Sequence, residues 1–169
     1  MMENFVNIQK TVLTLIEEKN FQRLRDLLTT MQPADIAALF AELSEKNLPL
    51  VFRLLPKDLA AETFVEMDSD RQHLLIQGFS DTELQEVINE LYVDDVAALI
   101  EEMPANVVKR ILRQADPETR RQINEILKYP EDSAGSIMTT EFVSLRANMT
   151  VAEALKRIRR QGIDSETIE

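Results

Sequence analysis

Large apolar residues recur every twelve positions along most of this chain, in three columns that run in phase. The first column contains Met31, Leu43, Leu55, Met67, Phe79, Leu91, Met103, Ala115 and Leu127. The second contains Leu15, Leu27, Leu39, Val51, Thr63, Leu75, Val87, Leu99, Ile111 and Ile123, and the third contains Ile16, Leu28, Phe40, Phe52, Phe64, Ile76, Ile88, Ile100, Leu112 and Asn124. A repeat this short cannot bury its own apolar face, so neighbouring repeats must stack into one core. The period therefore predicts an all-α, right-handed superhelix of about ten short helices, a scaffold that binds and gates more often than it catalyses.

Each repeat corresponds to a helix of about eight or nine residues and a short turn, so each helix is about 13 Å long. Helices this short are unstable alone, and packing against neighbours must hold them. We predict helices at 5–19, 22–30, 33–43, 47–54, 56–66, 69–77, 81–90, 93–102, 105–114 and 117–128.

Helix start signals recur in register with these ranges. Asp68 and Asp116 are predicted N-caps, and Ser80 with Glu83 has the spacing of a capping box. A first helical residue tolerates a missing N–H, and we place four prolines there: Pro33, Pro56, Pro104 and Pro117.

The composition indicates a soluble chain from a reducing compartment. Apolar residues make up 44% of the sequence, which can support a core, while cysteine is absent and glycine occurs three times. No disulfide framework or thiolate metal site is therefore possible. No apolar run approaches the roughly 20 residues needed to span a bilayer, and no signal peptide is visible. We expect no membrane insertion by this segment itself.

The charge is unevenly placed. The formal net charge is −11, which argues against nucleic acid as a partner because phosphates would be repelled. Between residues 62 and 102 the only basic residue is Arg71, and this window contains twelve carboxylates: Glu62, Glu66, Asp68, Asp70, Asp81, Glu83, Glu86, Glu90, Asp94, Asp95, Glu101 and Glu102. The window is either a solvated acidic face or a surface that attracts hard cations or a basic partner.

The repeat ends after Leu127, and a different pattern follows. Residues 129–136 contain Pro130 and Gly135 and are predicted to be a connector. A strand-like run at 137–145 comes next, and then Thr150 opens a helix by a capping box, with Val151, Ala154, Leu155 and Ile158 facing inward. One strand and one helix are not a domain, so we expect the chain to end inside a second one. The expected division is 1–128, 129–136 and 137–169.

The last segment resembles the start of a CBS domain. The resemblance rests on Ile137-Met138-Thr139-Thr140-Glu141-Phe142-Val143-Ser144-Leu145 and on the helix opened by Thr150-Val151-Ala152-Glu153-Ala154-Leu155. Together with the acidic twelve-residue repeat and the junction Tyr129-Pro130-Glu131-Asp132-Ser133-Ala134-Gly135-Ser136, the chain resembles the cytosolic part of the MgtE magnesium transporter/channel family. That family has a helical N domain, two CBS domains, a connecting helix and a transmembrane pore.

The resemblance implies a magnesium sensor on the cytoplasmic face of the cell membrane, in a homodimeric parent protein. In the family, Mg²⁺ bridges acidic groups of the N domain, the CBS domains and the connecting helix, and thereby closes the pore. Mg²⁺ prefers oxygen ligands, keeps several waters and is usually held by one or two carboxylates, so weak regulatory sites of this kind are chemically reasonable.

Three residues carry the implied magnesium sites. Glu62 and Asp94 match acidic N-domain positions, and Ser136 falls where the family has a glycine whose carbonyl contacts a metal. A further family position is Ala98 here, which removes one ligand. From the residues alone, Asp94 and Asp95 could equally favour a helix N-terminus, where carboxylates meet the macrodipole.

The residues bear on two other function classes. A protein-interaction scaffold is the alternative, because the middle domain of flagellar motor switch proteins is a similar acidic array of short helices. An enzyme lacks support, since the sequence has no Gly-rich phosphate loop and its single histidine, His73, has no nucleophile or metal-ligand setting.

Overall fold

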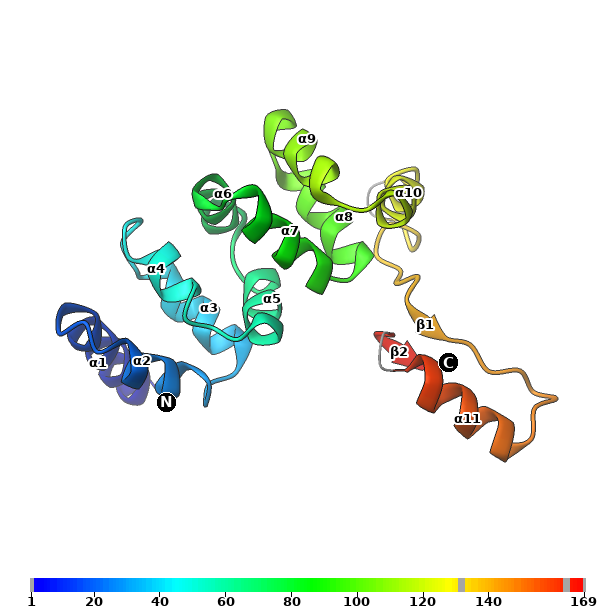
Figure 1. Ribbon diagram of the computed structural model, residues 1–169, viewed down its shortest axis with the longest axis horizontal. Helices are drawn as coiled ribbons and strands as arrows, with labels where there is room; N and C mark the ends of the chain where they lie inside the picture. The colour runs from blue at the N-terminus through cyan, green and yellow to red at the C-terminus, as the bar shows by residue number, and fades with distance from the viewer. Residues whose placement is uncertain (1, 131–132, 163–164, 169) are drawn as a thin grey trace. The chain divides into compact units, whose positions relative to one another are not determined.

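Ten short helices are followed by a small α/β segment in the described part of the chain, which the computed structural model defines for residues 2–130, 133–162 and 165–168, without the side chains of 2–6. Figure 1 shows the elements in order. The helices are α1 (Met2–Glu17), α2 (Phe21–Leu28), α3 (Pro33–Ala41), α4 (Leu48–Phe52), α5 (Lys57–Val65), α6 (Ser69–Gly78), α7 (Asp81–Glu90), α8 (Val93–Glu102), α9 (Ala105–Gln114) and α10 (Pro117–Ile126). The segment after them contains β1 (Phe142–Val143), α11 (Val151–Gln161) and β2 (Thr167–Ile168).

The predicted helices are confirmed, and α7, α8 and α9 have the predicted bounds. Most of the other helix ends differ by up to three residues, as helix ends usually do. The helix α4 is shorter than predicted: it covers Leu48–Phe52, buries Leu48, Val51 and Phe52, and ends before Arg53.

The capping residues act as predicted. The Asp68 carboxylate accepts a hydrogen bond from the Arg71 N–H, at 2.9 Å. Ser80 and Glu83 form a reciprocal pair, in which the Ser80 N–H donates to the Glu83 carboxylate at 2.8 Å and the Glu83 N–H donates to the Ser80 hydroxyl at 3.2 Å. Asp116 likewise caps α10.

Two of the four prolines immediately precede their helices and are not first helical residues. Pro33 and Pro117 are first helical residues, whereas Pro56 and Pro104 immediately precede α5 and α9. Pro56 has extended backbone angles, and its carbonyl accepts the Ala60 N–H at 2.8 Å. A missing N–H is as harmless at the cap as in the first turn, so the sequence rule does not separate the two positions.

The chain divides into two compact units. One contains α1–α7 and α9, and the other contains α8, α10 and the C-terminal elements. In the first unit α3 packs on α5, α5 on α7 and α7 on α9, and in the second α8 packs on α10. Each of these helices therefore packs on the second helix along the chain, which stacks the twelve-residue repeats as a solenoid requires.

The core of the first unit contains a cluster of phenylalanines from the third column of the twelve-residue repeat. Phe40, Phe52 and Phe64, twelve residues apart, are between 0% and 4% exposed. The Phe52 ring lies between the others, with its centroid 6.4 Å from that of Phe40, 6.3 Å from that of Phe64 and 5.5 Å from that of Phe79. Thr63, in a neighbouring column, is fully buried, and its hydroxyl has no hydrogen-bond partner among the described residues.

Two arginines connect helices that lie three elements apart in the first unit. Arg71 on α6 donates to the carbonyls of Ala41 and Leu43, at 2.5 and 2.8 Å, at the end of α3. Arg110 on α9 donates to the carbonyls of Ile76 and Phe79, both at 2.6 Å, at the end of α6. These carbonyls lack intrahelical partners, so guanidinium groups from helices much later in the sequence cap the C-terminal ends of α3 and α6.

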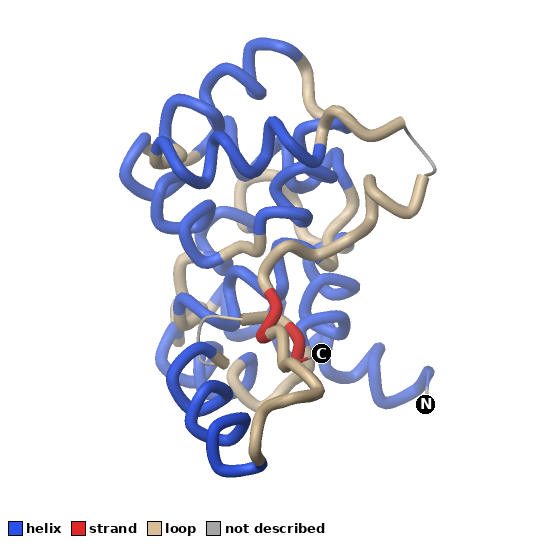
Figure 2. The backbone as a smooth tube through the Cα atoms, turned by 90° about the vertical axis from the view of Figure 1, so that its right-hand side faces the viewer, coloured by secondary structure: helices blue, strands red, loops and turns tan. Residues whose placement is uncertain are grey.

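The C-terminal segment forms a two-stranded parallel sheet, with Phe142 opposite Thr167 and Val143 opposite Ile168. Figure 2 shows the two strands side by side. We predicted a strand at 137–145, but the observed strand β1 covers only Phe142–Val143. Residues 137–140 form turns and irregular backbone, and the Ile137 side chain is 82% exposed.

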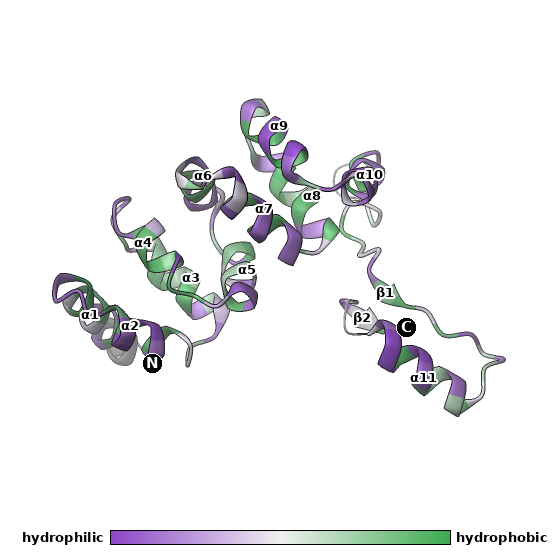
Figure 3. Ribbon diagram, viewed as in Figure 1, coloured by the Kyte–Doolittle hydropathy of each residue, from purple (hydrophilic) through white to green (hydrophobic). Residues whose placement is uncertain are grey.

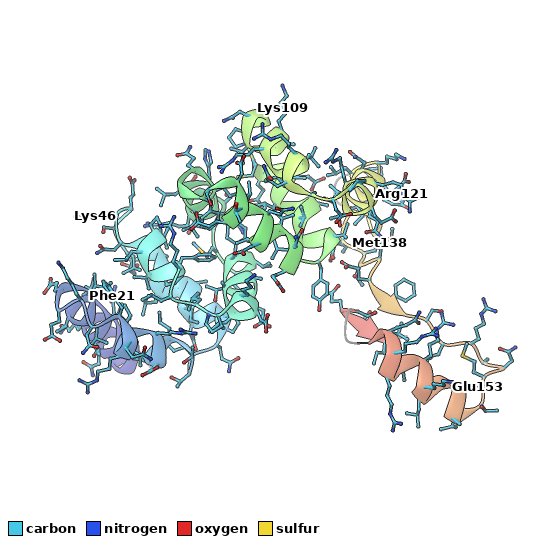
Figure 4. The ribbon with its side chains drawn as sticks, viewed as in Figure 1. Phe21, Lys46, Lys109, Arg121, Met138 and Glu153 are labelled. Carbon is cyan, nitrogen blue, oxygen red and sulfur yellow. The ribbon has the colours of Figure 1, made fainter. Side chains whose placement is uncertain are left out.

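The helix α11 begins as predicted but does not bury the predicted face. Thr150 and Glu153 form the capping box, and Glu153 lies on the first turn in Figure 4. However, Val151 is 76% and Leu155 is 45% exposed, so the prediction that they face inward is wrong for this chain. Figure 3 shows hydrophobic residues along α11, and a sheet of two short strands is too small to cover them.

Candidate metal centre

The three sequence-predicted ligands occupy different settings. Glu62 is exposed on α5 in the first unit, whereas Asp94 and Ser136 belong to the second. Ser136 lies in a turn and is half-buried, and its hydroxyl donates to the Ser133 carbonyl at 2.9 Å. Asp94 is half-buried in the first turn of α8. Glu131 and Asp132, in the predicted connector, lie outside the described residues.

The first turn of α8 is held by a side chain that the sequence analysis did not predict. The Val93 N–H donates to the Glu141 carboxylate at 2.7 Å. The first four N–H groups of a helix have no intrahelical acceptor, and a carboxylate at this end also meets the positive end of the helix dipole. Glu141 therefore caps α8 from the segment that leads into β1.

Glu141 and three further carboxylates meet at this contact, and the pKa values of Asp94, Asp95 and Glu141 are raised there. Burial raises the pKa of Asp95 to about 6. The charges of Asp94, Glu166 and Glu141 add to that shift. Burial also raises the pKa of Asp94 and of Glu141, with Glu166 contributing to both. At this helix N-terminus the dipole favours ionised carboxylates, but desolvation and like charge outweigh it.

One oxygen of the cluster has no hydrogen-bond partner. Asp94 Oδ1 is buried and accepts no hydrogen bond from the described residues. No group of three or more His, Cys, Asp or Glu side chains within these ranges has an arrangement that could hold a metal ion. A single carboxylate with a free oxygen fits Mg²⁺, which binds through one or two carboxylates and retains water. Asp94 can thus supply one ligand of a shared site, not a complete cage.

Part of the acidic window elsewhere is paired with cations from outside it. Arg53 binds Glu83 at 2.6 Å, and this hydrogen bond is the largest cause that lowers the pKa of Glu83 to about 2. Lys57 binds Glu86 at 3.4 Å. These pairs line a cavity of about 340 Å³ whose lining includes buried Phe52, Leu55 and Phe79. Since both lining cations already have carboxylate partners, the cavity does not suit a phosphate ligand.

Comparison with known proteins identifies the two sequence regions. Residues 31–132 match the family model of the MgtE intracellular N domain, and residues 134–165 match that of the CBS domain. The chain belongs to the MgtE family. The resemblance noted from the sequence is therefore confirmed.

The curated relatives are magnesium transporters. MgtE of Thermus thermophilus is 36% identical over 157 residues, which cover 90% of this chain and 35% of the relative. MgtE of Bacillus subtilis is 24% identical over 157 residues, which cover 93% of this chain and 35% of the relative. The chain thus spans about a third of their length. Because these relatives are transporters, family membership confirms the expectation that the chain is not an enzyme.

Two solved structures have the same fold. The crystal structure of the cytosolic domain of the Mg²⁺ channel MgtE in complex with ATP superposes with a TM-score of 0.84 at 32% identity, covering 95% of this chain and 67% of that one. The soluble part of a magnesium transporter superposes with a TM-score of 0.81 at 24% identity, covering 99% of this chain and 65% of that one.

Within the described residues, no helix is both long and apolar enough to cross a bilayer.

Sequence reasoning missed Glu141 and Glu166 because neither belongs to a local pattern. One sequence feature of this MgtE-family chain did indicate that the N–H groups at the start of α8 have a hydrogen-bond acceptor from elsewhere in the chain. The residue before α8 is Tyr92, which is not one of the short polar residues that usually cap a helix. A helix start without such a residue needs an acceptor from elsewhere, and Glu141 provides it.

The raised pKa of Asp95 predicts that stability increases as the pH falls from 7.5 to 5. The pKa of about 6 in the folded state lies above the ordinary value of 3.8 for an aspartate, so the folded state binds more protons in this window. After allowance for solvent screening of a half-exposed group, Asp95→Asn should raise the free energy of unfolding by about 1–2 kcal/mol at pH 7.5. Urea unfolding at both pH values measures this.

The control for this prediction is Glu101→Gln, at an exposed position on the same helix. The lowered pKa of Glu83 makes stability depend on pH only below about pH 4.5. It therefore does not offset the expected increase in stability between pH 7.5 and pH 5. An equal gain for Asp95→Asn at pH 5 and pH 7.5 would contradict the assignment.

Proposed function

We propose that this chain is the magnesium-sensing regulatory region of a magnesium transporter or channel, located on the cytoplasmic face of the membrane. The observation that carries the proposal is the consecutive match to the MgtE N domain and the CBS domain, on a chain with the fold of a solved Mg²⁺-channel cytosolic domain. The net charge of −11 supports a role for cations, and so does the Asp94 Oδ1 atom, which has no hydrogen-bond partner among the described residues.

In the proposed mechanism Mg²⁺ bridges acidic groups of the N domain and the CBS domains and closes the pore. Glu62, Asp94 and the carbonyl of Ser136 are this chain's proposed ligands. The remaining ligands come from the proposed partners, which are the rest of the CBS domains, the connecting helix and the transmembrane pore of a homodimeric parent. The division into an N domain at 1–128, a connector at 129–136 and the first CBS domain from 137 is part of the same proposal.

Limited proteolysis of the parent transporter tests the proposal. Mg²⁺ should protect the 129–136 connector, while K⁺ at the same ionic strength should not, because screening by salt is common to both ions and bridging is not. The variant Glu62→Gln with Asp94→Asn should shift the protection midpoint to about tenfold higher Mg²⁺, equivalent to a loss of about 1.4 kcal/mol.

The matched control is Glu66→Gln with Glu101→Gln, which removes two exposed carboxylates from α8 and the end of α5 without touching the proposed ligands. An unshifted midpoint in the first variant would show that these ligand assignments are wrong. Equal protection by Mg²⁺ and K⁺ would favour the acidic interaction scaffold instead.

A further inference from the structure

Glu141 contacts two separate elements through different groups. Its carboxylate accepts the Val93 N–H of α8 at 2.7 Å. Its main-chain carbonyl accepts the Glu166 N–H at 2.7 Å, directly before β2. Its own N–H donates to the Thr139 hydroxyl at 3.1 Å. One residue therefore joins the start of α8 to the starts of both strands.

The Val93 N–H depends on this contact. Val93 is 3% exposed, so water has little access to it. The first amide of α8 with an acceptor in the preceding backbone is that of Val96, which donates to the Tyr92 carbonyl at 3.1 Å. A buried N–H at the beginning of a helix needs an external acceptor, and Glu141 is that acceptor.

Like charge opposes the same contact. Asp94 and Asp95 follow Val93 directly, and Glu166 is the residue whose N–H donates to the Glu141 carbonyl. Each of these carboxylates interacts electrostatically with at least two others of the group. The hydrogen bond and the helix dipole hold Glu141 in place, while the neighbouring carboxylates repel it, so the balance responds to cations in solution.

We propose that Glu141 is a positioning residue whose hydrogen bond to Val93, the Glu141 latch, fixes the first turn of α8 and hence Asp94 against the beginning of the CBS domain. Cations tighten the Glu141 latch by offsetting the surrounding negative charge. The cation dependence rests on the proposed function, whereas the latch itself rests only on contacts within this chain.

Amide hydrogen exchange at Val93, measured by NMR on the 169-residue chain, reports the latch directly. Glu141→Ala should accelerate exchange at Val93 about 10- to 100-fold, the loss expected for a hydrogen bond to a charged group. Exchange at Val96 should change little, because its acceptor is in the preceding backbone. The substitution is remote in sequence from both amides, so their intrinsic exchange rates do not change.

Glu141→Gln separates the hydrogen bond from the charge. Glutamine keeps an oxygen acceptor, so exchange at Val93 should stay closer to the wild-type rate than to that of Glu141→Ala. It also removes one negative charge, so the slowing of Val93 exchange by Mg²⁺ seen in the wild type should become smaller. Glu101→Ala, at an exposed position near the other end of α8, is the matched control and should leave Val93 unaffected.

Two failures are distinguishable. Unchanged Val93 exchange in Glu141→Ala, with the fold retained by circular dichroism, overturns the latch whether or not the wild type responds to Mg²⁺. If the wild-type rate responds equally to Mg²⁺ and to K⁺ at matched ionic strength, the latch stands and the magnesium-specific part of the proposed function fails.

Discussion

Replacement of Phe52 by alanine lowers the free energy of unfolding by about 3–5 kcal/mol, the range for deleting a buried aromatic ring. Phe52 is 4% exposed, and its ring lies within 6.4 Å, between centroids, of Phe40, Phe64 and Phe79. The loss combines the transfer free energy of the ring with the cavity that remains between three rings. Urea unfolding followed by circular dichroism measures it.

Phe142→Ala is the control for this prediction. Phe142 is 43% exposed on β1, so its truncation should change the free energy of unfolding by less than about 1 kcal/mol. Comparable losses at the two positions would mean that the aromatic contacts at Phe52 do not stabilise the repeats.

Replacement of Arg110 by methionine lowers the free energy of unfolding by about 2–4 kcal/mol. The substitution keeps an apolar stem but leaves the carbonyls of Ile76 and Phe79 without the donors that now lie at 2.6 Å. It also removes the ion pair with Asp81, at 3.0 Å. Most of the loss comes from the two part-buried carbonyls, since an exposed ion pair alone contributes little.

Arg113 provides a close comparison, because it binds the same Asp81 at 3.4 Å but its side chain is 67% exposed. Arg113→Met should change stability by no more than about 0.5 kcal/mol. Arg110→Lys restores the charge without the forked geometry and should recover only part of the loss. Equal effects of the Arg110 and Arg113 substitutions would show that charge, and not carbonyl capping, matters here.

The helices of this chain could be predicted because their determinants are local. The column of Phe40, Phe52 and Phe64 marks the core by spacing alone, and Asp68 and Asp116 mark helix starts by their own short side chains. No comparable pattern reveals where a long side chain such as that of Arg110 reaches, because its partners lie about thirty residues away.

The candidate site was predictable only in part, for the same reason. Asp94 is proposed only through the resemblance to the MgtE family, and Glu141, which binds the preceding Val93 N–H, comes from a segment about fifty residues later and arrives through tertiary structure. The error at α11 has another cause. Val151 and Leu155 have the spacing of an inward face, but spacing indicates a preference for burial and does not provide the surface that buries it.

The packing of each helix on its second neighbour has a consequence for how such a chain can change length. The helices α3, α5, α7 and α9 form one contact series, and α4 with α6 belongs to another. Deleting a single twelve-residue repeat would move every later helix from one series to the other and would exchange its partners. Deleting two consecutive repeats would restore each helix to its own series. Viable insertions and deletions in this array should therefore come in pairs of repeats.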